Sequence, residues 1–79
     1  MHTNASAEVG ANIRAEMARR GVAQMTLAAA VGVSQSGLSK RLRGHTPLDV
    51  NELLRIAAFL DVPVNDLIPA HLASEQVPA

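Results

Sequence analysis

The 79-residue chain contains no cysteine, tryptophan or tyrosine and only one phenylalanine, Phe59. Without cysteine, neither a disulfide framework nor a thiolate metal site is available, which fits a reducing cytoplasm. Because aromatic side chains are almost absent, base stacking of the kind used by RNA and single-stranded DNA domains is disfavoured. No apolar run approaches the roughly 20 residues of a membrane span, and the N-terminus lacks a signal-peptide pattern. We therefore expect a cytoplasmic protein without a membrane partner.

The sequence also lacks the residue patterns of catalytic, metal and cofactor sites. Its three histidines, His2, His45 and His71, follow no metal-ligand spacing. No serine has a plausible base and orienting acid in its neighbourhood. The segment from Gly32 to Gly37 lacks the lysine and hydroxyl residue that would complete a phosphate loop. We expect no enzymatic activity, no cofactor and no metal.

Positive charge is concentrated in the middle of the chain, although the formal net charge is zero. Residues 17–48 contain five basic and no acidic side chains, whereas residues 1–16 sum to −1 and residues 49–79 to −4. A basic block between acidic flanks fits a nucleic-acid interface, but it also fits an ordinary solvated surface. Charge alone leaves both interpretations open.

Apolar periodicity predicts short helices along the whole chain, and no strand pattern or internal repeat appears. A first helix should follow Ser6, its expected cap, and should carry Val9, Ile13 and Met17 as one stripe up to Gly21. The other expected helices cover residues 24–31, 35–43, 50–60 and 64–68. With flexible ends at residues 1–5 and 70–79, the chain should form one all-α domain of five short helices over residues 6–69.

Polar residues and glycines mark the expected helix ends, and apolar residues mark the expected core. Gly32 should adopt a left-handed turn conformation, Ser34 should cap the third helix, and Asp49 with Glu52 should form a capping box on the fourth. The residues expected to be buried are Met17, Met25, Leu27, Ala28, Val31, Leu53, Leu54, Ile56, Ala57 and Leu60.

The third expected helix, residues 35–43, separates polar from apolar side chains. At 100° per residue, Leu38 and Leu42 lie on one side, and Ser36, Lys40 and Arg43 lie on the opposite side. Ser39 and Arg41 occupy the two flanks. Such a surface can enter a groove about 12 Å wide and donate hydrogen bonds to bases or phosphates. An amphipathic helix that simply faces water would show the same pattern.

The spacing of two neighbouring helices separates these interpretations. A first helix carries Leu27 and Ala28, a short glycine turn follows at Gly32-Val33-Ser34, and a second helix carries Leu38 and Leu42. This is the pattern of a helix-turn-helix unit, whose second helix lies in the DNA major groove. The pattern favours nucleic-acid binding by residues 35–43.

Residues from about 13 to 68 resemble the Cro and phage-repressor type of helix-turn-helix domain, the XRE family. The segments LAAAVGVSQSGLS and LLRIAAFLDVPVNDL carry the resemblance, which covers roughly 70% of the chain. It implies a five-helix lambda-repressor-like fold, binding to double-stranded DNA, and a dimer on a near-palindromic operator. It also implies a core position for Phe59 and a dimer region around Phe59, Val62, Val64 and Leu67.

The resemblance also implies roles for individual residues. Gln24 matches a backbone-anchoring glutamine at the start of the second helix, and Ser34 begins the tip of the recognition helix. Ser39, on a flank of that helix, is added to the backbone set. The expected base-contacting residues are Gln35, Ser36, Lys40 and Arg41. The expected backbone-contacting residues are Gln24, Ser34, Ser39, Arg43, His45 and Thr46.

Two positions depart from the family pattern. Many members pair an arginine in the first helix with a glutamate late in the recognition helix, where this chain has Met17 and Leu42. An apolar pair can replace a buried ion pair without loss, so we expect Met17 and Leu42 to be in contact, within about 5 Å. The second departure is Arg41, where the family usually has an apolar residue. Its stem should cover the core while its charge reaches a phosphate.

The expected function is that of a small dimeric repressor, of the phage Cro-like, immunity-repressor or controller type, that blocks polymerase access. An alternative is an antitoxin that uses the same domain for autoregulation and covers a toxin with the fifth helix and the tail. The acidic residues Asp61, Asp66 and Glu75 would then face a basic partner. Ordering of residues 70–79 on such a partner would favour the alternative.

Overall fold

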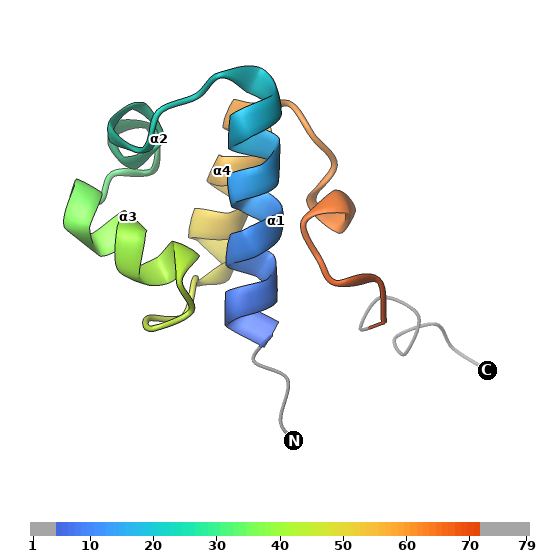
Figure 1. The fold of residues 1–79 in the computed structure, drawn as a ribbon. Helices are drawn as coiled ribbons and strands as arrows, with labels where there is room; N and C mark the ends of the chain where they lie inside the picture. The colour runs from blue at the N-terminus through green and yellow to red at the C-terminus, as the bar shows by residue number, and fades with distance from the viewer. Residues whose placement is uncertain (1–4, 72–79) are drawn as a thin grey trace.

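The computed structural model of the protein describes residues 5–71, and each regular element in this part is helical (Figure 1). The elements are α1 (Ala5–Arg20), α2 (Gln24–Val31), α3 (Gln35–Leu42), α4 (Val50–Leu60) and the 3-10 turn η1 (Val64–Asp66). The all-α prediction is therefore confirmed for this part of the chain. The fifth expected helix, over residues 64–68, is only a 3-10 turn. The expected flexible ends, 1–5 and 70–79, fall almost entirely outside the described residues.

Local hydrogen bonds explain where α3 and α4 begin. The Ser34 hydroxyl oxygen accepts a hydrogen bond from the Gly37 N–H at 2.9 Å. At α4, the Asp49 carboxylate accepts from the Glu52 N–H at 2.7 Å, and the Glu52 carboxylate accepts from the Asp49 N–H at 3.2 Å. The predicted cap and capping box are therefore confirmed. The α1 prediction differs, because α1 begins at Ala5 and Ser6 lies inside the helix.

The turn between α2 and α3 is the one that the sequence predicts. Gly32 has a φ of 85°, in the left-handed region, and its N–H donates to the Ala28 carbonyl oxygen at 2.9 Å. An L-residue with a side chain would be strained in this conformation. The turn lets α3 follow α2 within three residues, so the two helices form the expected helix-turn-helix unit.

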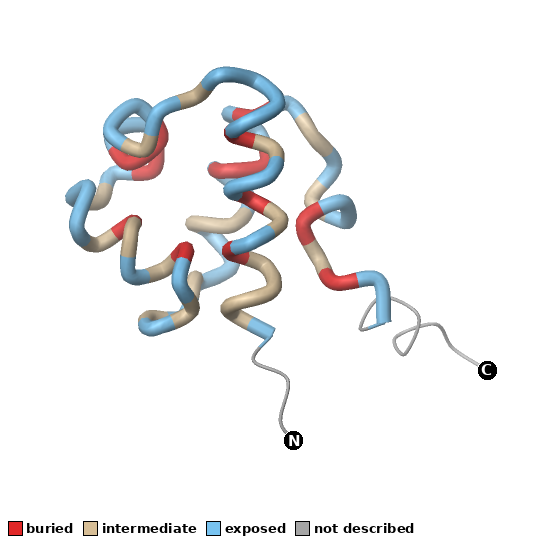
Figure 2. The backbone as a smooth tube through the Cα atoms, viewed as in Figure 1, coloured by how far each residue is buried: buried red, intermediate tan, exposed pale blue. Residues whose placement is uncertain are grey.

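The hydrophobic core lies where the four helices meet, and Figure 2 shows the buried positions of each helix turned toward the others. The recognition-helix candidate α3 packs on α1 and α2, while α4 packs on α1, α2 and η1. In Figure 1, η1 lies on the side of α1 opposite to α2 and α3. The core consists of Ile13, Met17, Leu27, Ala28, Val31, Leu38, Leu42, Ile56, Ala57, Leu60 and Leu67.

Three residues expected in the core lie on the surface instead. Met25 is 67% exposed, Leu54 49% and Phe59 44%. At 100° per residue, each lies about 110° from the centre of the arc of buried residues on its own helix. The three side chains therefore stand on the flanks of their helices, outside the arc that faces the core. Apolar character marked them for burial, and helix geometry overrides that expectation.

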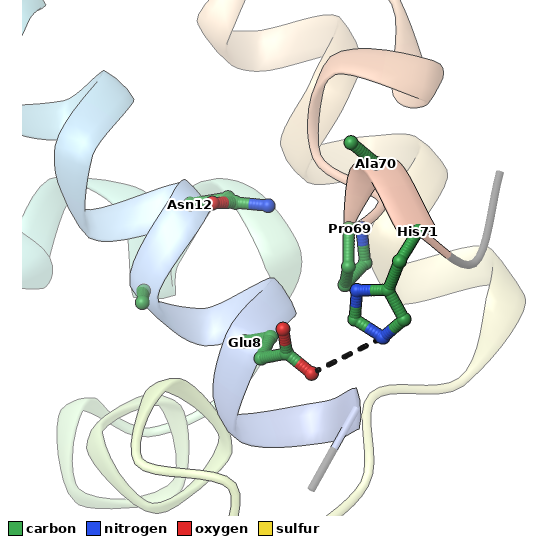
Figure 3. Close-up of a pocket in the computed structure, with 6 residues that line it drawn as sticks. Glu8, Asn12, Pro69, Ala70 and His71 are labelled. Carbon is green, nitrogen blue, oxygen red and sulfur yellow. Dashed lines mark ion pairs between the residues drawn. The ribbon is translucent and has the colours of Figure 1, made fainter. Parts of the chain in front are cut away.

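The last described residues return to α1. The Asn12 side-chain amide donates to the Leu67 carbonyl oxygen at 3.0 Å, and Pro69 is buried. Figure 3 shows the His71 imidazole directed at the Glu8 carboxylate, 3.8 Å away. Leu67 itself is fully buried, so this segment completes the core on the side of α1 away from α3.

A close backbone contact joins α1 to α3. A Cβ atom built on the buried Gly10 would lie 2.9 Å from the Leu42 Cα and closer still to the Leu42 carbonyl group. These neighbours are backbone atoms, which cannot rotate out of the way as a side-chain tip can. Only a glycine at this position lets the end of α3 approach α1 so closely.

Gly10→Ala tests this contact. At an exposed helix position, the change would stabilise the fold by about 1 kcal/mol through helix propensity. Here we expect the free energy of unfolding to fall by about 1–3 kcal/mol, because the added methyl group forces the helices apart. Urea denaturation measures the effect. The control Ala15→Gly, at an exposed position of α1, should cost about 1 kcal/mol through propensity alone. A stabilised Gly10→Ala protein would contradict the contact.

Candidate nucleic-acid interface

The helix α3 presents its polar side to solvent, as the sequence predicts. Leu38 and Leu42 are buried, at 0% and 1% exposure, and hold α3 on the core. Gln35, Ser36, Lys40 and Arg43 are exposed, and no hydrogen bond from their side chains occurs within residues 5–71. Ser36, Lys40 and Arg43 therefore give one face of α3 hydroxyl and cationic donors that are free to meet a ligand, and Gln35 adds an exposed amide at the first turn of the helix.

The chain beyond α3 is held by backbone hydrogen bonds. The N–H of His45 donates to the Lys40 carbonyl oxygen at 2.9 Å, and that of Gly44 donates to the Arg41 carbonyl oxygen at 3.1 Å. This pair of bonds is a Schellman motif, which closes a helix with a left-handed residue, and Gly44 has a φ of 81°. The motif sets the exposed His45 and the half-buried Thr46 immediately beyond Arg43.

The helix α2 begins differently from α3. Its N-cap residue Ala23 offers no side-chain cap, so the first backbone N–H groups of α2 lack a side-chain acceptor. Free N–H groups and the positive end of the helix dipole form a favourable site for a phosphate oxygen. Gln24, the expected backbone contact, is half-buried and is the first residue of α2.

Some basic side chains of the block at residues 17–48 are already bound to other groups of the protein. Arg19 and Arg20 pair with the Glu16 carboxylate at 2.6 and 2.9 Å. Arg20 also donates to the Leu60 carbonyl oxygen at 2.6 Å, and Arg55 donates to the Val31 carbonyl oxygen at 3.3 Å. Within the described part of the chain, the basic residues without an ion pair or hydrogen bond are Arg14, Lys40 and Arg43. Two of these three belong to α3 and its C-cap.

Arg41 does not face outward with its neighbours. Its Nε donates to the Glu52 carboxylate at 3.1 Å, and its Nη1 donates to the Gly37 carbonyl oxygen at 2.9 Å. The side chain is 21% exposed and that of Glu52 is 14% exposed. The sequence showed Glu52 only as a capping residue, because no local pattern links it to a position eleven residues earlier. Glu52 is the site residue that sequence reasoning missed.

The proposed contact between Met17 and Leu42 stays a prediction. Both side chains belong to the core cluster. The backbone of Leu42, however, packs at Gly10, which precedes Met17 by seven residues, or about 10 Å along a helix. The two side chains thus share a core without a demonstrated contact.

Nine of the ten predicted site residues belong to α3 or to the segments directly next to it, and Gln24 is the first residue of α2. Their contacts with a ligand remain predictions, but their exposure separates them into two groups. Ser34, Gln35, Ser36, Lys40, Arg43 and His45 are exposed, whereas Gln24, Ser39, Arg41 and Thr46 are half-buried.

Residues 5–71 were also compared with the requirements of a metal site, a membrane span and a ligand pocket. No group of three potential metal ligands occurs in this range. No helix described there is long and apolar enough to span a membrane. A pocket of about 470 Å³ lies between α1 and the last described residues, lined by Glu8, Ala11, Asn12, Pro69, Ala70 and His71 (Figure 3). It is on the side of α1 away from α3, and these lining residues have no hydroxyl, thiol or amine side chain.

Comparison with known proteins agrees with this geometry. The domain is of the helix-turn-helix class, with an eight-residue second helix exposed along its polar face. Residues 13–67 match the helix-turn-helix family, and the chain belongs to this family, in its XRE type. A search of curated protein sequences finds no significant match.

Solved structures of gene regulators share the fold. One structure of the clp gene regulator ClgR from Corynebacterium glutamicum has a TM-score of 0.77 and 26% identity, with complete coverage of both chains. Another ClgR structure is 30% identical, over 84% of this chain and 69% of that one, with a TM-score of 0.76. The restriction-modification controller protein C.AhdI from Aeromonas hydrophila has a TM-score of 0.73 and 26% identity, over 78% of this chain and 94% of that one.

Proposed function

We propose that this protein is a sequence-specific regulator of transcription that binds double-stranded DNA with α3 in the major groove. The observation that carries the proposal is the outward face of α3. There, the cations Lys40 and Arg43 and the polar residues Gln35 and Ser36 have no competing partner within the described residues. A helix about 10–12 Å across with its side chains fits a major groove about 12 Å wide.

The positions of these residues suggest a division of labour. Ser36 and Lys40 lie on the exposed face of α3, Gln35 is exposed at its first turn, and the three would read base edges. The uncapped start of α2 and the loop after α3 would hold phosphates. The residues assigned to the DNA backbone are Gln24, Ser34, Ser39, Arg43, His45 and Thr46. Arg41 is left out of the base-reading set, since Glu52 and Gly37 hold its guanidinium group.

The mode of regulation that we propose is repression by a dimer. The similar proteins are a gene regulator and a restriction-modification controller, and a small controller or Cro-like repressor would act by covering a promoter. Exposed apolar side chains on α4 support dimer formation: Val50 is 71% exposed and Leu54 49%, and they stand one turn apart. In the region first expected, around Phe59, Val62, Val64 and Leu67, Phe59 is 44% exposed, Val62 and Val64 are half-buried and Leu67 is fully buried.

Selection of bound duplexes from a random DNA library, at about 0.15 M salt, tests the proposed function. We expect enrichment of an inverted repeat with half-sites about 10 bp apart, since two-fold protein symmetry is mirrored in the operator. A library that stays random after selection would contradict a sequence-specific regulator. A single enriched half-site without a repeat would contradict the dimer.

Lys40→Ala and Arg43→Ala should weaken binding in different ways. Loss of a base contact at Lys40 should relax base preference by roughly 1–3 kcal/mol, measured on the selected duplex and on single-base variants. Loss of a phosphate contact at Arg43 should weaken all duplexes alike and flatten the salt dependence by about one counterion. Arg19→Ala, which removes a cation remote from α3, is the matched control. Equal effects of both α3 changes on selected and random DNA would refute the assignment.

Leu54→Glu should dissociate the dimer, because a charge would be buried in the apolar contact between two copies of α4. Sedimentation velocity measures the monomer fraction at a fixed protein concentration. Ala15→Glu adds the same charge at an exposed position of α1 and serves as the control. A Leu54→Glu protein that stays dimeric would place the contact between copies elsewhere.

A further inference from the structure

The Arg41 guanidinium group joins α3 to the start of α4. Within the described residues, it makes the side-chain hydrogen bond that bridges these two helices, at 3.1 Å from Nε to the Glu52 carboxylate. Glu52 is itself held, because the same carboxylate oxygen accepts from the Asp49 N–H at 3.2 Å. The arginine is therefore tied to a capping box and not to a mobile surface glutamate.

Gly37, one helical turn before Arg41, leaves room for the arginine side chain. A Cβ atom at Gly37 would lie 3.1 Å from the Arg41 Nη1 and 3.0 Å from the Ser34 Oγ. The missing side chain lets Arg41 Nη1 reach the Gly37 carbonyl oxygen at 2.9 Å. The guanidinium group of Arg41 is thus held by two hydrogen bonds, from Nη1 to its own helix and from Nε to α4.

The hydrogen bonds of Arg41 restrain rolling of α3 about its own axis, which its two buried leucines restrain only weakly. The buried residues of α3 are Leu38 and Leu42, which stand one turn apart on a line along the helix. Packing along one line resists translation better than rolling about that line. A roll of about 10° would move side-chain tips on the far face, about 11 Å away, by roughly 2 Å. Hydrogen bonds to bases tolerate only about 0.5 Å.

Direct contact of Arg41 with DNA would be costly. The guanidinium group would have to give up its bonds to Glu52 and to Gly37. It would also leave a carboxylate that is 14% exposed without its cation, and an unpaired, largely buried charge is strongly unfavourable. The exposed cations Lys40 and Arg43 reach a ligand without that loss.

We propose that Arg41 and Glu52 are positioning residues, which set the orientation of α3 on the domain and through it the sequence preference. This inference rests on the proposed DNA-binding function. It replaces the expectation that Arg41 itself contacts a base, and it gives Glu52, a capping residue of α4, a part in recognition by α3.

The test compares Arg41→Met, Glu52→Gln and the double variant for binding to the selected operator and to a random duplex. Glutamine keeps an oxygen that can accept the Asp49 N–H, so the capping box survives. We expect each single change to lower the ratio of operator to random affinity about tenfold and the double change to lower it no further, because the two residues act as one unit. Affinity for random DNA and its salt dependence should stay unchanged.

Two outcomes would overturn the inference. If Arg41→Met lowers the ratio and neither Glu52→Gln nor Glu52→Ala, which removes the acceptor oxygen as well as the charge, lowers it, Arg41 reads DNA directly. If neither change lowers it, the ion pair serves stability alone. Arg19→Met, which breaks another arginine–glutamate pair at a site remote from α3, should leave the ratio unchanged. All affinities are measured at a temperature where urea denaturation shows each variant to be folded.

A measurement without DNA separates this inference from the proposed function. Residual dipolar couplings of backbone N–H groups report the orientation of α3 relative to α4 in the free protein. We expect the same reorientation of α3 in both single variants, together with a shifted Arg41 Nε signal in Glu52→Gln. An unmoved α3 would refute the positioning role on its own. A wild-type protein without any operator preference would instead refute the proposed function.

Discussion

The contact between the backbones of α1 and α3 at Gly10 and Leu42 is the constraint on which the interface depends. The α3 helix is only eight residues long and buries two leucines, and isolated helices shorter than about 12 residues are marginal in water. Its existence therefore comes from what it packs against. A glycine on α1 brings the end of α3 close enough for Leu42 to enter the core, which turns the polar side of α3 outward.

Arginine has two roles in this domain, and only one concerns a ligand. Arg20 and Arg55 donate to the carbonyl oxygens of Leu60 and Val31, the last residues of α4 and α2. Cations at helix C-termini satisfy free carbonyl groups and oppose the helix dipole. The arginines that hold helix ends are consequently unavailable to a nucleic acid. Of the described cations without a partner, Lys40 and Arg43 belong to α3 and its C-cap, and Arg14 belongs to α1.

Local signals predicted much of the fold from the sequence. The Ser34 cap, the Asp49 capping box and the Gly32 turn each depend on residues a few positions apart, so their chemistry is visible in the sequence. Met25, Leu54 and Phe59 were placed in the core wrongly, because their apolar character says nothing about which side of a helix they occupy. The Gly10 contact and the Arg41–Glu52 pair join different helices, and no local pattern reveals them. The exposed face of α3 was predictable, whereas the restraint on its orientation was not.

The short length of α3, which buries only Leu38 and Leu42, also has a consequence for the lifetime of the protein in a cell. An eight-residue helix has little stability of its own, and segments of low stability open most readily to proteases. If α3 lies in DNA as proposed, a bound molecule gains about 2.7 kcal/mol when DNA is present at 100 times the dissociation constant. Degradation would then remove unbound molecules first. The amount of regulator would follow the number of its occupied sites.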